Sequence, residues 1–256
     1  MHEQSLCRVK VLRLSIFASR NHKRYIMANA KTKLLKKIDC VLFDMDGVII
    51  DSEVLHKRAY YQTFESLGLD VSDDLYKTLT GSSTINAFQK LLAHFKLNEN
   101  PEDLVLRKRK VYVDLFENDP TLHLVNGVEE LIQYLHEKGI KMVLASSSAM
   151  VNINRVFKRF DLDKYFVAKI SGADLERSKP FPEIFEKAAL LGETARENCV
   201  VIEDSDNGVA AANAAGIFVF GYRNPMASDQ SLANADQVIS DFKEVREKIE
   251  SLEASL

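Results

Sequence analysis

Two carboxylates stand directly behind an apolar run in the segment CVLFDMDGVIIDSE, residues 40–53. Asp44 closes the run, Asp46 follows two positions later, and Gly47 allows a sharp exit of the chain. Acids placed so close to a buried segment repel one another unless a cation neutralises them, and oxygen ligands alone favour Mg²⁺. Since a metal-bound phosphate can be approached by a carboxylate, the pair suggests phosphoryl transfer.

Further polar motifs follow three later apolar runs. They are Ser146-Ser147-Ser148 after residues 142–145, Ser178-Lys179-Pro180 after residues 168–170, and Glu203-Asp204-Ser205 after residues 200–202. The Ser146 hydroxyl and Lys179 suit the binding of phosphate oxygens, whereas Glu203 and Asp204 add ligands for a metal. Ser148 also has the residue type of a helix N-cap.

These motifs need a scaffold that brings them together. From residue 38 the sequence alternates strand-like runs (41–43, 142–145, 168–170, 200–202 and 218–220) with helical segments (128–137, 151–160, 182–191 and 209–215). Near-continuous apolar strands separated by helices predict an α/β fold, a doubly wound parallel sheet covered on both faces. Ligands of such sheets bind at the carboxyl ends of the strands, where all four motifs fall.

One region departs from this alternation. Residues 53–123 read as helices only, which is too long for a simple crossover between two strands. We therefore predict an inserted helical cap domain at 53–123, with hinges at 51–54 and 120–126. The catalytic core then comprises 38–52 and 124–256.

The four motifs together resemble the haloacid dehalogenase superfamily, and within it the branch with a small helical cap that includes β-phosphoglucomutases and sugar-phosphate phosphatases. The residues that carry the resemblance are FDMDGVIIDSE, LASSS, SKPFPEIF and IEDSDNGVAAANAAG, within residues 38–223. The resemblance implies a Rossmann-like core and a phosphoric monoester hydrolase.

The resemblance also implies a role for each motif. Asp44 is the nucleophile that forms an aspartyl-phosphate, and Asp46 is the general acid and base. Ser146, Ser147 and Lys179 bind the phosphate, and His56 lies near the leaving group. Mg²⁺ is held by Asp44, the Asp46 carbonyl and Asp204, with Glu203 assisting. An aspartate at position 46 argues against a dehalogenase.

Other interpretations of the sequence remain. His56 is equally well interpreted as a solvated residue on a helix. The basic cluster 107–110 is typical of a solvated helix face; in a second interpretation one member, Lys108, reaches the substrate. A mutase of the β-phosphoglucomutase type shares the first chemical step, but relatives grip a second phosphate with a cap arginine where this chain has Thr84. A signalling receiver would lack the helical insertion, and a catalytically dead binding protein would lack a motif residue.

Charge and composition narrow the class of protein. Residues 1–37 hold ten Lys/Arg and one acid, so of the net charge of −3 the remainder carries −12. An acidic body argues against nucleic-acid binding, and no apolar run reaches the roughly 20 residues of a membrane span. Cys40 and Cys199 abut apolar runs, as is typical of buried thiols in a reducing compartment.

We expect a cytoplasmic monomer acting on a small phosphorylated metabolite. The basic extension 1–37 is expected to be disordered, with a targeting segment or an upstream start at Met1 instead of Met27 as alternatives.

Overall fold

The computed structural model describes residues 35–79, 83–225 and 230–255, and the predicted basic extension lies almost wholly outside them. Its core is a six-stranded parallel sheet with the strand order β3-β2-β1-β4-β5-β6. The strands are β1 (Cys40–Phe43), β2 (Lys141–Ser146), β3 (Ala168–Ser171), β4 (Cys199–Glu203), β5 (Phe218–Tyr222) and β6 (Gln237–Ile239). The five predicted strands are all present. The three-residue edge strand β6 was not predicted. In the described residues, no helix is long and apolar enough to cross a membrane.

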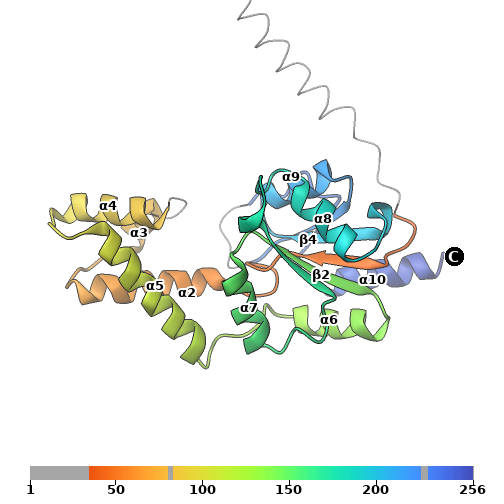
Figure 1. The fold of residues 1–256 in the computed structure, drawn as a ribbon, viewed down its shortest axis with the longest axis horizontal. Helices are drawn as coiled ribbons and strands as arrows, with labels where there is room; N and C mark the ends of the chain where they lie inside the picture. The colour runs from red at the N-terminus through yellow and green to blue at the C-terminus, as the bar shows by residue number, and fades with distance from the viewer. Residues whose placement is uncertain (1–34, 80–82, 226–229, 256) are drawn as a thin grey trace, which may run out of the picture. The chain divides into compact units, whose positions relative to one another are not determined.

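Alternate residues of β1 enter two different hydrophobic layers. Val41 and Phe43 pack with one buried cluster, and Cys40 and Leu42 pack with the other. Figure 1 shows the two layers of helices, one on each face of the sheet. Helices α6 (Val128–Glu137), α7 (Met150–Arg159) and α10 (Lys243–Glu253) supply the first cluster, and α8 (Glu183–Leu191) and α9 (Asp206–Ala214) the second. Burial on both faces explains why the strands read as continuous apolar runs.

Four helices occupy the chain between β1 and α6. They are α2 (Ser52–Ser66), α3 (Asp73–Leu79), α4 (Thr84–Phe95) and α5 (Pro101–Asn118). Their apolar faces form a separate buried cluster that includes Phe64, Phe88 and Leu104. Because this cluster is independent of the sheet, the four helices have a core of their own. Helix α2 already begins at Ser52, inside the predicted hinge 51–54, and we retain 53–123 as the proposed extent of the cap.

The helices nearest the sheet also join the main core. Leu55 and Ala59 of α2 and Leu115 and Phe116 of α5 belong to the same buried cluster as β1. Burial of one such large apolar side chain contributes about 1.5–3 kcal/mol. This packing places the base of the helical insertion beside the carboxyl end of β1, where the predicted site lies.

Candidate active site

Asp44 and Glu203 lie side by side because their strands are hydrogen-bonded in register. Phe43 of β1 is paired with Ile202 of β4, and the Asp44 amide continues the ladder by donating to the Ile202 carbonyl at 3.0 Å. Asp44 directly follows Phe43, and Glu203 directly follows Ile202. Both side chains are nearly inaccessible to solvent, with exposed fractions of 7% and 1%. Parallel pairing therefore creates a buried pair of carboxylates.

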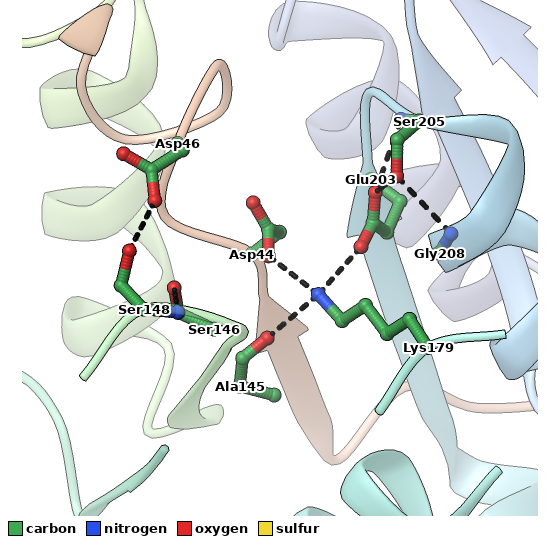
Figure 2. A network of polar contacts seen from close by, with 9 residues as sticks. All are labelled: Asp44, Asp46, Ala145, Ser146, Ser148, Lys179, Glu203, Ser205 and Gly208. Carbon is green, nitrogen blue, oxygen red and sulfur yellow. Dashed lines mark hydrogen bonds and ion pairs between the residues drawn. The ribbon is translucent and has the colours of Figure 1, made fainter. Parts of the chain in front are cut away.

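Lys179 joins these two acids to the neighbouring strand. Its Nζ atom donates to Asp44 Oδ1 at 2.5 Å, to Glu203 Oε1 at 2.6 Å and to the Ala145 carbonyl at 3.0 Å, as Figure 2 shows. Burial disfavours its positive charge, but the two carboxylates outweigh burial and raise the pKa of Lys179 above its ordinary value. The lysine is thus held charged with all three ammonium hydrogens in use.

Glu203 is held from its other side by the start of α9. The Ser205 amide and hydroxyl both donate to Glu203 Oε2, at 3.1 and 2.9 Å. The same hydroxyl accepts from the Gly208 amide and caps the helix. A Cβ atom at Gly208 would overlap the Glu203 carboxylate, so only glycine fits there. Glu203 therefore fixes the position of Lys179 through contacts on both of its oxygens.

Asp204 completes the cluster of acids and lies against Gly47. The glycine has a φ of 81°, and a Cβ atom at this position would overlap the Asp204 carboxylate. Burial and the neighbouring Glu203 charge raise the pKa of Asp204 to about 7. Burial, the largest cause, together with the Glu203 charge likewise raises the pKa of Asp44, against the opposing effect of Lys179. The prediction that Gly47 permits a sharp turn behind β1 agrees with this conformation.

These carboxylates fit a divalent cation. One oxygen of each of Asp44, Glu203 and Asp204 lies within 4.8 Å of the others. Three acids face one ammonium group, so the cluster lacks positive charge. Burial, with the repulsion among the acids, raises the pKa of Asp44 and Asp204, and a bound cation would offset both effects. A donor set made only of oxygens is the set that Mg²⁺ prefers.

The Asp46 side chain is directed away from this cluster, as Figure 2 shows. Its Oδ1 accepts from the Ser52 hydroxyl at 2.5 Å and its Oδ2 from the Ser148 hydroxyl at 2.7 Å. The prediction of Ser148 as an N-cap is wrong, because α7 is preceded by Ala149 without a side-chain cap. The Ser148 hydroxyl is instead bound by a carboxylate 102 positions away.

Of the two serines predicted to bind phosphate, Ser146 and Ser147, only Ser146 lies within the polar network of Figure 2. It is buried at the end of β2, and its hydroxyl accepts from the Ser148 amide at 3.1 Å. Ser147 is exposed on the bend that follows β2.

His56 lies on α2, apart from the acid cluster. Its Nδ1 atom is 2.7 Å from Nζ of the buried Lys108, and its ring stacks on Tyr112. Burial and the Lys108 charge lower the pKa of His56 to about 4. Burial also lowers the pKa of Lys108 to about 8, although Glu53 partly opposes it. His56 is therefore neutral at pH 7 and accepts a hydrogen bond from Lys108.

Asp46 and His56 share the wall of one cavity of about 270 Å³. Its other lining residues are Met45, Ile50, Ser52, Glu53, Tyr112, Phe116, Ser148, Asn152, Arg155 and Val156. A second cavity, of about 660 Å³, lies between α6, β5 and α10 and contains none of the predicted site residues. Because the smaller cavity lies beside the Asp46 carboxylate, it is the one that suits a substrate.

Several residues of the site were not predicted. Ser52 and Ser205 position carboxylates, Gly208 makes room for Glu203, and Asn224 donates to the Gly47 carbonyl at 2.9 Å. Ser205 stands directly after Glu203-Asp204, and its type as an N-cap was the available signal. Ser52 and Asn224 carry no such signal, because their contacts depend on the tertiary fold.

Comparison with known proteins agrees with this geometry. The family model of haloacid dehalogenase-like hydrolases matches residues 41–222. The chain belongs to this family. The phosphorylated carbohydrates phosphatase of Thermotoga maritima is 31% identical over 206 residues, which cover 78% of this chain and 93% of the relative. The β-phosphoglucomutase of Bacillus subtilis is 30% identical over 204 residues, covering 78% and 88%.

A solved structure extends the similarity to the fold of this haloacid dehalogenase-like hydrolase. A Thermotoga maritima protein, provisionally assigned as a β-phosphoglucomutase, has a TM-score of 0.75 and 29% identity over 86% of this chain and 100% of that chain. The predictions of a Rossmann-like core with a helical cap, and of a phosphoric monoester hydrolase of this superfamily, are confirmed.

Proposed function

We propose that this haloacid dehalogenase-like hydrolase is a Mg²⁺-dependent phosphatase that hydrolyses a small phosphorylated metabolite, of the sugar-phosphate class, through an aspartyl-phosphate on Asp44. The observation that carries the proposal is the position of Asp44, in contact with Lys179 and within 4.8 Å of the carboxylates of Glu203 and Asp204. The names of the similar proteins, a phosphorylated carbohydrates phosphatase among them, support the substrate class.

The proposed metal site uses oxygens at the ends of β1 and β4. The Asp44 and Asp204 carboxylates and the Asp46 main-chain carbonyl would hold Mg²⁺, with Glu203 assisting by its charge. When bound, the ion supplies the positive charge that neutralises phosphate oxygens next to a carboxylate nucleophile. Lys179 adds a second positive charge through its contact with Oδ1 of Asp44.

Asp44 is proposed to attack phosphorus with one carboxylate oxygen while the bond from phosphorus to the ester oxygen breaks. Lys179 and the Ser146 hydroxyl, with amide groups behind β2, bind the phosphate oxygens, and Ser147 contributes from the same bend. Asp46 donates a proton to the departing ester oxygen. It later takes a proton from the water that attacks phosphorus and releases inorganic phosphate from Asp44.

His56, held from behind by the buried Lys108, is proposed to line the side of the site where the leaving group departs. Both belong to the helical insertion, and their contact of 2.7 Å leaves an uncharged imidazole beside the cavity. Closure of the cap over a small metabolite would exclude bulk water during the transfer.

A mutase of the β-phosphoglucomutase type is the second candidate, and the Bacillus subtilis relative favours it. Such an enzyme must grip a second phosphate while the substrate turns around. In this chain Thr84, at the start of α4, stands where the resemblance would place an arginine. We therefore rank hydrolysis first.

A screen of hexose, pentose, polyol and nucleotide phosphates with Mg²⁺ tests the proposal, with release of inorganic phosphate as the readout. We expect hydrolysis of at least one carbohydrate phosphate, and loss of p-nitrophenyl phosphate turnover in Asp44→Asn. Retained turnover in that variant would refute the nucleophile. Rapid conversion of β-glucose 1-phosphate to glucose 6-phosphate with a bisphosphate primer would establish the mutase instead.

A further inference from the structure

Arg155 of α7 lines the same cavity as Asp46 but takes no part in the chemistry proposed above. Its Nη1 atom donates to Oδ1 of Asn152 at 3.2 Å, one helical turn earlier. Among the described residues, no carboxylate lies within the 4.0 Å of an ion pair to its guanidinium. The side chain is half-buried, so its charge is only partly solvated.

Two other arginines near the base of the cap are fully engaged. Arg159, one turn further along α7, donates to the main-chain carbonyls of Phe116 and Asp119. Arg58 of α2 forms an ion pair with Asp119. These two cations hold the chain at the end of α5. Arg155 does not share that structural role, because its one side-chain partner here is a neutral amide on its own helix.

The groups facing Arg155 across the cavity leave its charge available. Asp46 is bound by two serine hydroxyls, and the charge of Glu53 interacts with Lys108. His56 is neutral with Lys108 on its Nδ1 atom. The Arg155 charge acts on Tyr112 to lower its pKa, but burial and Asp46 dominate and raise that pKa to about 12. Tyr112 therefore stays neutral and supplies no anion. A half-buried guanidinium without an anionic partner is suited to bind carboxylate or phosphate in a bidentate manner.

The position of Arg155 along α7 places it away from the reacting phosphate. The helix begins at Met150, directly behind the serine bend, and rises about 1.5 Å per residue. The Arg155 Cα atom is therefore about 8 Å further along the helix axis, and its guanidinium lies back towards Asn152, whose Oδ1 it contacts at 3.2 Å. The wall of the cavity thus has Asp46 beside the serine bend and the Arg155 guanidinium at the level of Asn152, further along α7.

We propose that Arg155, oriented by Asn152, is a specificity-determining residue that binds an anionic group at the end of the substrate remote from the transferred phosphate. The group is a carboxylate or a second phosphate. Unlike the arginine of the mutases, Arg155 belongs to the core and not to the cap, and the β-glucose 1-phosphate assay above separates a bisphosphate phosphatase from a mutase. This inference rests on the proposed function, and it narrows the substrate class from carbohydrate phosphates in general to those that carry a second acidic group.

Binding measurements in the Asp44→Asn background test this inference without turnover. Titration calorimetry with Mg²⁺ compares 6-phosphogluconate with sorbitol 6-phosphate, which has the same carbon chain but no carboxylate. A second pair, glucose 1,6-bisphosphate and glucose 6-phosphate, distinguishes a second phosphate from a carboxylate. We expect one of the doubly acidic ligands to bind about ten- to hundredfold more tightly than its partner, as for a hydrogen bond to a charged group.

Arg155→Gln in this background should abolish that preference by weakening the binding of the doubly acidic ligand. Arg155→Lys should retain part of the preference. Lys158 is an exposed cation on the same helix, so Lys158→Gln serves as the matched control and should change the affinity for neither ligand. The inference would be overturned if Arg155→Gln weakened the binding of both ligands equally, or if the Asp44→Asn parent showed no preference between them. Failure of the proposed function shows separately, as a wild-type enzyme that does not hydrolyse p-nitrophenyl phosphate with Mg²⁺.

Discussion

The Nζ atom of Lys179 lies 2.5 Å from Oδ1 of Asp44, although 135 positions separate the two residues in the chain. Both side chains are nearly inaccessible, and Glu203 holds the lysine from the other side at 2.6 Å. A buried cation between two buried acids has no solvent to replace a missing partner. The contact therefore matters for the stability of the fold and, in the proposed mechanism, for the reactivity of Asp44.

Replacement of Lys179 by methionine should abolish turnover and destabilise the metal-free protein. The change leaves two buried carboxylates without their cation, which costs about 3–5 kcal/mol in comparable buried pairs. Urea unfolding in EDTA measures the loss. Lys187→Met, which breaks a pair with Glu183 at the surface, is the control and should cost less than about 1 kcal/mol. Equal stability of the two variants would contradict the role assigned to Lys179.

Removal of Mg²⁺ should stop turnover and lower the melting temperature. The acids of the cluster repel one another, so a bound cation stabilises the folded state by about 2.7 kcal/mol at a hundred times its dissociation constant. Thermal unfolding with Mg²⁺ or EDTA measures this effect. Asp204→Asn should lose most of the rise in melting temperature that Mg²⁺ causes, whereas Asp174→Asn, a change at an exposed acid, should keep it. A full Mg²⁺ response in Asp204→Asn would remove that residue from the metal site.

Alanine at Gly208 should lower activity through Glu203. Its Cβ atom would overlap the Glu203 carboxylate, which must then shift and release Lys179. We expect a destabilisation of about 1–3 kcal/mol, as for overpacking, together with a loss of turnover per folded molecule. Gly68→Ala is a control that separates the two effects, because Gly68 also resists substitution, with a φ of 68°, but has no neighbour within 4 Å. Its activity per folded molecule should stay unchanged.

The convergence of Asp44, Lys179 and the two acids behind β4 could be predicted from the sequence because a parallel sheet leaves little freedom. Once each motif follows an apolar strand, the strand ends meet at one edge. Residues 128–137 of α6 were predicted with the observed bounds, since the apolar period and a following glycine define both ends. Local signals of this kind are strong in helices that bury one face and in strands that are buried on both faces.

The remaining features depend on contacts between distant residues. Ser148 has the type of an N-cap, but the Asp46 carboxylate takes its hydroxyl. Arg155 on α7 cannot be distinguished from a solvated helical arginine until the cavity wall is known. Strand β6 has only three residues, too few for a period to appear. Tertiary geometry, rather than local propensity, decides each of these cases.

Stability at acidic pH should depend on His56. Burial, with the Lys108 charge, lowers its pKa to about 4, whereas the unfolded chain has the ordinary value of about 6.5. Between these two values the unfolded state binds a proton that the folded state does not. The free energy of unfolding should therefore fall as the pH is lowered from 6.5 towards 4, by at most about 1.4 kcal/mol per pH unit from this residue. Above pH 6.5 the residue is neutral in both states and adds no pH dependence.

The variant His56→Gln isolates this contribution, because glutamine can still accept a hydrogen bond from Lys108 but does not titrate. Urea unfolding of wild type and variant at pH 4.5, 5.5 and 7.0 should give curves that differ in slope only below pH 6.5, with the variant losing less stability. His94→Gln is the matched control, since His94 is exposed at the end of α4 and should leave the wild-type slope intact. If His56→Gln loses stability as steeply as wild type over this range, the imidazole is not held neutral by its surroundings, and the uncharged partner proposed for the leaving-group side of the site would have to be abandoned.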